Sequence, residues 1–295
     1  MKFKGIIPAM ITPFSEDGKL YYNGLINELE YLYESGFKNI FVCGSYGSFP
    51  LLTPSERMSI ADVVCKYCSD KGIKTIIHIG SASTQEAVYL AKAAEICGAD
   101  AVSSVVPYYY SSSFYNENNY LKYFETIINS VDIDVHLYNN PKTTGYNVSL
   151  EFLKRLVNIG LKGIKDGTPK PERVKKVLSM TRDFDYYPSS TAHLIIGFEL
   201  GVSACISGVS LSVPKLVLDI YENIKTNPDY SKELHEKVMK VRSILGLNWA
   251  RAIAAYDVLN VKGVDVGTCR EPWIKLSSHE SSWIIDELKK LEVLR

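Results

Sequence analysis

Residues 134–167 read DVHLYNNPKTTGYNVSLEFLKRLVNIGLKGIKDG and contain the pattern that decides the fold. Two short apolar runs, at 134–141 and 160–167, enclose a segment with apolar residues at helical spacing, 149–160, whose last residue is Gly160. Helices commonly end at a glycine, and a strand, a helix and a second strand in this order are typical of a parallel βαβ unit. This stretch therefore predicts parallel β-structure with a crossover helix.

The same alternation extends over most of the chain. Strand-like runs occur at 6–12, 39–44, 74–80, 101–109, 134–141, 160–167, 184–190 and 203–208. Helical patterns lie between them, for example at 23–36, 54–72, 84–98 and 119–130. Eight such units favour an α/β fold in which the sheet closes as a (β/α)₈ TIM barrel. Because strand-like runs cease near residue 212, we expect a barrel domain at 1–224 and a C-terminal helical extension at 225–295.

Charge and hydropathy exclude several classes of partner. The 33 Lys and Arg residues balance the 33 Asp and Glu residues, so we expect neither nucleic acid nor an anionic membrane as a partner. No apolar run approaches the roughly 18 residues of a membrane span, and Pro8 and Pro13 interrupt any signal-peptide core. These features predict a cytoplasmic protein that acts on a small molecule.

The cysteines and histidines do not indicate a metal or a cofactor. Six cysteines are scattered along the chain, and the one CxxC pair, Cys65 and Cys68, lies in a helical pattern without a second pair at ligand spacing. We interpret the pair as small apolar residues, with zinc or redox chemistry as the alternative. The five histidines do not gather, and His136 is best interpreted as a core residue. We therefore expect no metal and no cofactor.

In a barrel enzyme the chemistry lies at the carboxyl ends of the strands, which singles out Lys165. Burial at such a strand end lowers a lysine pKa, and the neutral amine can form a Schiff base with a ketone. Tyr138 ends the preceding strand and can exchange protons with the reacting groups. The alternatives are a lysine that extends past the strand into solvent and a tyrosine that belongs to the core.

The loop GSYGS at 44–48 and the run PYYY at 107–110 follow two other strands. In the loop, glycines allow close approach of the backbone, and Ser45 with neighbouring amides can hold a carboxylate. The alternative is a tight connection without a binding role. The tyrosines fit a proton relay, an apolar plug or a subunit contact, and composition favours the subunit contact.

Six segments in order resemble the pyruvate-dependent class I aldolase and lyase family, which includes dihydrodipicolinate synthase, N-acetylneuraminate lyase and 2-keto-3-deoxygluconate aldolase. They are PAMITPFSEDG (8–18), GSYGS (44–48), PYYY (107–110), YNNPKTTG (138–145), GIKDG (163–167) and GVSACISG (201–208). The resemblance implies that Lys165 forms the Schiff base and that Tyr138 is the acid/base. It also implies that Ser45 binds the pyruvyl carboxylate and that the Ile206 carbonyl lines the site.

The resemblance further implies a homotetramer built from two dimers, in which Tyr109 reaches across an interface into the neighbouring active site. Two positions depart from the family pattern inside the site. Tyr46 replaces a threonine that relays protons between the tyrosines, so either the relay is rebuilt or Tyr46 points elsewhere, for example to shape the aldehyde pocket. Ser189 replaces a glycine that often follows the seventh strand, and it is a candidate contact for a sugar hydroxyl.

Other departures point to one branch of the family. Thr143 stands where the synthases carry an arginine for a second carboxylate, and Ser48 stands where synthases and sialic acid lyases carry a glutamate. The segment GSFPLLTPSE (47–56) is similar to archaeal 2-keto-3-deoxygluconate aldolases. Ser111 and Ser112 occupy the stretch where members that accept a phosphorylated substrate tend to place an arginine, which favours the unphosphorylated sugar acid.

We therefore expect reversible cleavage of 2-keto-3-deoxygluconate to pyruvate and glyceraldehyde, a reaction of Entner–Doudoroff carbohydrate metabolism. The alternatives within the family are an N-acetylneuraminate lyase and an enzyme like dihydrodipicolinate synthase. A different class of function, a barrel that binds a keto acid without turning it over, is suggested by Tyr46.

Overall fold

The computed structural model describes residues 3–110, 116–180, 183–247 and 251–294. Within these ranges the chain contains eight short strands, each one nearly or wholly buried. They are β1 (Gly5–Pro8), β2 (Asn39–Val42), β3 (Lys74–His78), β4 (Ala101–Ser104), β5 (Asp134–Asn139), β6 (Gly163–Asp166), β7 (Asp185–Pro188) and β8 (Ala204–Ser207). Seven of them lie within a predicted strand run, while β1 begins one residue before its run of 6–12; all eight are shorter than the runs.

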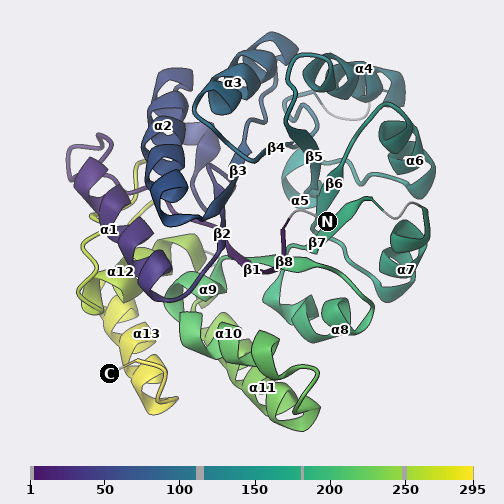
Figure 1. Cartoon of the computed structure of the whole chain (residues 1–295). Coiled ribbons are helices and arrows are strands. Elements are labelled where there is room, and N and C mark those ends of the chain that lie inside the picture. Colours follow the sequence, from purple (N-terminus) through teal and green to yellow (C-terminus); the bar gives the residue numbers. More distant parts are fainter. Residues whose placement is uncertain (1–2, 111–115, 181–182, 248–250, 295) are drawn as a thin grey trace.

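The strands form a closed ring. Strands β2 to β7 pair in chain order as a parallel sheet, and β1 pairs in parallel with β8. The two parts meet where Ala9 bridges Phe41, and on the other side where the Cys205 thiol donates to the Pro188 carbonyl. Figure 1 shows the strands in the centre and the helices around them. The predicted (β/α)₈ barrel is confirmed.

The ring of helices covers the outer face of the strands (Figure 1). It comprises α1 (Tyr22–Glu34), α2 (Pro54–Lys71), α3 (Thr84–Ile96), α4 (Glu117–Ile128), α6 (Leu150–Asn158), α7 (Pro171–Met180), α8 (Leu194–Glu199) and α10 (Pro214–Asn223). Because the strands pack against helices outside and against one another inside, both faces are apolar, which explains the continuous apolar runs in the sequence.

Local sequence sets the ends of these helices. At the start of α2, the Thr53 side chain accepts from the Glu56 N–H at 3.2 Å, and the Glu56 carboxylate accepts from the Thr53 N–H at 2.9 Å. This reciprocal capping satisfies backbone donors that have no partner inside the helix. The helix stops at Gly72, whose φ of 66° suits a glycine. The capping fixes the direction in which the chain leaves the loop after β2.

Short helices occupy the loops that follow four of the strands. They are η1 (Phe49–Leu51) after β2, α5 (Pro141–Thr144) after β5, η2 (Thr191–His193) after β7 and α9 (Val209–Ser212) after β8. All four lie at the carboxyl ends of the strands, so they build the rim of the barrel mouth.

A C-terminal group of helices packs on one side of the barrel, beside α1 and α10 (Figure 1). It consists of α11 (Pro228–Ile244), α12 (Arg251–Val261) and α13 (Ser278–Lys290). Lys262, directly after α12, donates to the Ser212 carbonyl at 2.6 Å and to the Tyr31 hydroxyl at 3.0 Å, which ties the group to the barrel. The division of the chain at residue 224 stays a prediction. None of the helices in the described ranges is long and apolar enough to cross a membrane.

Candidate active site

The carboxyl ends of β5 and β6 bring Tyr138 and Lys165 side by side. The two residues are register partners in the parallel ladder, so their side chains point to the same face of the sheet. Both are buried, with 7% of Tyr138 and 5% of Lys165 exposed. The Lys165 Nζ lies 4.0 Å from the centroid of the Tyr138 ring and 3.7 Å from that of the Phe41 ring. The amine is therefore enclosed by aromatic rings and does not extend into solvent.

Burial changes the protonation of Lys165. Because the ammonium form loses its hydration inside the barrel, the pKa of Lys165 falls to about 7. A substantial fraction of the amine is therefore neutral near pH 7. A neutral amine is the nucleophile that attack on a ketone requires.

Ser45 and Asn140 surround the phenol of Tyr138. Ser45 Oγ lies 3.5 Å from the phenolic oxygen, and the Asn140 amide donates to the Tyr138 oxygen at 3.3 Å and to Ser45 at 3.4 Å. Burial raises the pKa of Tyr138, although the hydrogen bond with Ser45 acts in the opposite direction, so the phenol is protonated at neutral pH. Sequence analysis missed Asn140, because an amide two residues after the tyrosine has no distinctive spacing.

The loop at 44–48 turns sharply and leaves a row of backbone amides open. Cys43 before the loop and Ser48 at its end have positive φ angles of 53° and 52°, which are uncommon outside glycine. The Ser48 N–H donates to the Ser45 carbonyl at 3.2 Å. Within the described part of the chain, the amides of Ser45, Tyr46 and Gly47 have no recorded acceptor. Successive amides of this kind form a concave site for an anion.

The Tyr46 ring packs against the loop after β8. A Cβ atom at Gly208 would lie 2.1 Å from Cζ of this ring, so only a glycine leaves room for it. Burial raises the pKa of Tyr46 to about 12, while Arg251 acts in the opposite direction. The sequence left two readings of Tyr46 open, a rebuilt relay or a side chain that points elsewhere; its ring lies against Gly208, and the hydroxyl in contact with Tyr138 is that of Ser45. Tyr46 therefore joins two loops without displacing the hydroxyl beside Tyr138.

Ile206 lies on β8 and Ser189 directly follows β7, so both lie at the same barrel mouth. Ile206 on β8 is 1% exposed and belongs to the apolar cluster inside the barrel that also contains Tyr138. Ser189 directly follows β7, and its N–H donates to the Asp166 carbonyl at 2.9 Å. The structure thus brings both predicted residues to the barrel end where Lys165 lies.

A buried ion pair beside the reactive pair was not predicted. Asp166 is fully buried and accepts from Arg173 Nε at 2.6 Å, from the Tyr186 hydroxyl at 2.8 Å and from the Asn139 amide at 2.9 Å. Burial alone would raise the pKa of Asp166, but the charge and hydrogen bonds of Arg173 and the other donors lower it, so the carboxylate stays ionised. Because Asn139 and Asp166 directly follow the tyrosine and the lysine, this network fixes the ends of both strands.

Tyr109 does not join the buried cluster of its own chain. Its side chain is 78% exposed, and its ring contacts the Tyr110 ring edge-on at 5.2 Å between centroids. A cavity of about 440 Å³ opens beside Ser45, and none of the described residues that line it carries a charge. Its walls include Phe49, Leu51, Tyr108, Thr143, Thr144 and Trp273.

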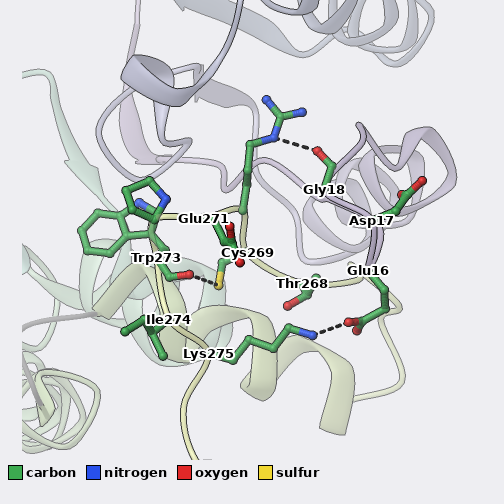
Figure 2. Close-up of a pocket in the computed structure, with 11 residues that line it drawn as sticks. Glu16, Asp17, Gly18, Thr268, Cys269, Glu271, Trp273, Ile274 and Lys275 are labelled. Atoms are coloured by element: carbon green, nitrogen blue, oxygen red, sulfur yellow. Dashed lines mark hydrogen bonds and ion pairs between the residues drawn. The ribbon is translucent and has the colours of Figure 1, made fainter.

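A larger groove of about 970 Å³ shares Pro272 and Trp273 with this cavity. Figure 2 shows its two walls, residues 16–18 and 268–275, which an ion pair between Lys275 and Glu16 connects. No predicted site residue lines the groove. The candidate active site is therefore the barrel mouth with the smaller cavity beside it.

The cysteine pair lies on an outer helix, whereas the His78 ring contacts the Tyr138 ring edge-on at 5.9 Å between centroids. Cys65 and Cys68 are buried free thiols on α2, and burial raises the pKa of both to about 12. His78 packs against Phe49, and burial lowers its pKa, so the imidazole is neutral. Among the described residues, no three His, Cys, Asp or Glu side chains gather where they could hold a metal ion.

Comparison with known proteins covers nearly the whole chain. The sequence profile of the Dihydrodipicolinate synthetase family matches residues 2–291. The chain is 29% identical over 295 residues to the 4-hydroxy-tetrahydrodipicolinate synthase of Archaeoglobus fulgidus, with 99% of each sequence covered. This relative carries the name of the synthase branch and not that of the 2-keto-3-deoxygluconate aldolases.

Solved structures agree with the fold. A prophage protein of E. coli K12 from the dihydrodipicolinic acid synthase family, solved in complex with pyruvate, superposes with a TM-score of 0.92 at 24% identity, covering 99% of this chain and 100% of that one. The N-acetylneuraminate lyase of Mycoplasma synoviae superposes with a TM-score of 0.89 at 25% identity, covering 98% of each chain.

Proposed function

Because the chain belongs to the dihydrodipicolinate synthetase family, and with it to the carbon–carbon lyases of the class I aldolase type, we propose that Lys165 forms the Schiff base with pyruvate. The observation that carries this proposal is the buried amine over the Tyr138 ring. Lys165 is the one buried lysine among the described residues. Lys262, whose pKa burial lowers to about 8, is engaged with the Ser212 carbonyl instead.

The reaction follows from the two side chains. The Lys165 amine attacks the ketone of a 2-keto acid, water leaves, and a protonated imine forms. The Tyr138 phenol gives its proton to the hydroxyl that leaves as water and then, as phenolate, accepts the proton of the hydroxyl on the second carbon from the imine carbon. The bond between that carbon and the intervening one breaks, the imine takes up its electron pair as an enamine, and the aldehyde departs. Protonation of the enamine and addition of water then release pyruvate and restore the amine.

The loop at 44–48 supplies the site for the carboxylate of the keto acid. The open amides of Ser45, Tyr46 and Gly47 act as donors, and the Ser45 hydroxyl adds another. Since Ser45 also lies beside the Tyr138 phenol, a carboxylate held there places the adjacent ketone close to the amine. Ile206 contributes the opposite wall, and Ser189 is a candidate contact for a hydroxyl of the substrate.

We infer that the substrate is 2-keto-3-deoxygluconate, cleaved reversibly to pyruvate and glyceraldehyde. The support is the uncharged cavity beside Ser45. An aldehyde with a carboxylate needs a cation there, and none of the described lining residues, which include Thr143 and Thr144, supplies one. The preference for an unphosphorylated substrate rests on Ser111 and Ser112, which lie outside the described residues.

A second candidate is a synthase that condenses pyruvate with an aldehyde bearing a carboxylate. The name of the Archaeoglobus fulgidus relative favours it. A panel of acceptors with pyruvate distinguishes the candidates: glyceraldehyde, aspartate semialdehyde and N-acetylmannosamine. We expect the highest kcat/KM with glyceraldehyde, and a higher value with aspartate semialdehyde would assign the chain to the synthase branch.

Borohydride trapping tests the Schiff base directly. Incubation with pyruvate and borohydride is expected to leave a reduced adduct on the peptide that contains Lys165 and to abolish activity, while the Lys165→Met variant gains no adduct. An enzyme that stays unmodified and active under these conditions would disprove the mechanism. An adduct without turnover of any aldehyde would instead favour a keto-acid-binding protein.

We also propose that the protein is a homotetramer in which Tyr109 of a second copy completes each site. The exposed Tyr109 ring and the apolar cavity beside Ser45 support this, because exposed aromatic side chains near an apolar cavity are typical of subunit contacts.

A further inference from the structure

Thr12 connects the segment after β1 to the loop at 44–48. Its side chain is 2% exposed, and its hydroxyl donates to the Gly47 carbonyl at 2.7 Å. A Cβ atom at Gly47 would lie 3.3 Å from Thr12 Oγ1, 3.3 Å from the Met10 carbonyl oxygen and 3.2 Å from Cys43 Cα. The loop therefore lies directly against residues 10–12, with no space for water at the contact.

This hydrogen bond fixes the peptide group between Gly47 and Ser48. The carbonyl of that group accepts from Thr12, and its N–H donates to the Ser45 carbonyl at 3.2 Å. Both polar atoms of this peptide group are therefore engaged, and the N–H groups of Ser45, Tyr46 and Gly47 stay available to a ligand. We propose that Thr12 is a positioning residue, which holds the loop so that these amides meet the substrate carboxylate; the inference rests on the proposed function.

The same threonine also contacts the C-terminal helices. Its carbonyl accepts from the Tyr256 hydroxyl at 2.7 Å, and Tyr256 lies on α12 with 3% of its side chain exposed. The loop is thus the end of a buried series of hydrogen bonds that begins on α12. Through Thr12, helix α12 contributes to the geometry of the loop.

Loss of the Thr12 hydroxyl has a specific consequence. The Gly47 carbonyl would stay buried without a partner, and a glycine has the widest freedom to rotate its peptide groups. Rotation relieves the unsatisfied carbonyl and turns the neighbouring amides away from the carboxylate. Lys165 and Tyr138 lie on other strands and keep their geometry, so binding of pyruvate should suffer more than the chemical step.

The Thr12→Val variant tests this proposal because valine keeps the shape and removes the hydroxyl. We expect the pyruvate concentration that half-saturates borohydride trapping to rise roughly tenfold or more, with kcat changed less than about threefold. Thr12→Ser, which restores the hydroxyl, should return the half-saturation to within about threefold of the wild type. Thr75→Val is the matched control, since Thr75 is equally buried and its hydroxyl accepts from the Asp100 N–H at 3.3 Å. Thr75 lies near the amino end of β3, away from the barrel mouth.

Equal half-saturation in Thr12→Val and the wild type would overturn the proposal, and so would an equal shift in Thr75→Val. If Thr12→Val does not fold, Thr12→Cys, with its weak donor, replaces it and should again bind pyruvate more weakly than Thr12→Ser; equal binding by these two variants would overturn the proposal. Failure of the proposed function is recognised separately, because the wild type itself would then show no adduct on Lys165.

Discussion

At the scale of single residues, the same burial leaves Lys165 partly neutral and Tyr138 protonated. Burial disfavours the charged form of each group, so it lowers the pKa of the lysine and raises that of the tyrosine. The amine becomes a nucleophile while the phenol keeps its proton. A water-poor barrel mouth thus gives both groups the protonation states that the proposed Schiff-base reaction uses.

The pKa of Lys165 predicts the pH dependence of catalysis. Below its pKa of about 7 the amine is mostly protonated, so kcat/KM for the keto acid should fall about tenfold for each pH unit and level off above the pKa. The pH profile of kcat/KM measures this directly. A profile that is flat between pH 5 and 8 would contradict it.

Replacement of Tyr138 by phenylalanine should separate proton transfer from binding. Tyr138→Phe keeps the ring over which the amine lies and removes the hydroxyl that contacts Ser45. We expect kcat to fall by about 10²–10⁴ because an acid/base group is lost, while the borohydride adduct on Lys165 still forms at a slower rate. Tyr187→Phe is a control, since Tyr187 is a buried tyrosine on β7 next to Lys165 in the ladder. Equal losses in the two variants would contradict the assignment of Tyr138.

At the scale of secondary-structure elements, the ends of β5 and β6 are held by buried polar contacts and not by loop packing alone. Asp166 at the end of β6 accepts hydrogen bonds from β5, from β7 and from Arg173 on α7. The strand that carries the lysine is therefore fixed to both neighbouring strands and to the helix outside. This explains how a residue on a strand only four residues long keeps a defined position.

Removal of the arginine should test this connection. Arg173→Met leaves Asp166 buried without its cation, and we expect the free energy of unfolding to fall by about 3–5 kcal/mol. Urea denaturation measures the loss. Arg155→Met is the matched control, because Arg155 forms a half-exposed ion pair with Glu117 that should contribute about 0–1 kcal/mol. Similar losses in both variants would show that the Asp166 pair has no special role.

At the scale of the whole molecule, Tyr109 differs from the other proposed site residues because its side chain is exposed on its own chain. The uncharged cavity beside Ser45 is open in the single chain. A second copy that inserts its Tyr109 would cover the cavity and exclude water from the bond that breaks. Assembly of the oligomer would then be required for full activity.

Subunit mixing tests whether Tyr109 acts between chains. Lys165→Met and Tyr109→Phe are expected to be impaired separately. Refolded together in equal amounts, they should recover about a quarter of the wild-type activity, since half of the dimers are hybrids with one complete site. Activity measured before and after mixing provides the readout. A mixture no more active than the mean of its components would place Tyr109 in its own chain or outside the reaction.

The positions of the strands and of the reactive lysine were predictable because both depend on local patterns. Strands buried on two faces need apolar runs such as 74–80, and a lysine at the end of such a run, as at Lys165, is conspicuous. The helices α7 and α8 and the short helices of the mouth were not named from the sequence. Their segments are short or weakly periodic, so tertiary packing decides their conformation.

The sequence by itself determined the barrel, the order of its elements and the residues at its mouth, since hydrophobic periodicity and strand ends are properties of neighbours along the chain. Only the tertiary structure decided that Ser45 and not Tyr46 meets the Tyr138 phenol, that Arg173 neutralises Asp166, and that Thr12 holds Gly47. The phenol and the threonine contacts join residues far apart in the sequence, and the arginine contact depends on how α7 packs on the sheet. Each of these contacts therefore forms only when the barrel closes, because closure brings the carboxyl ends of the strands together.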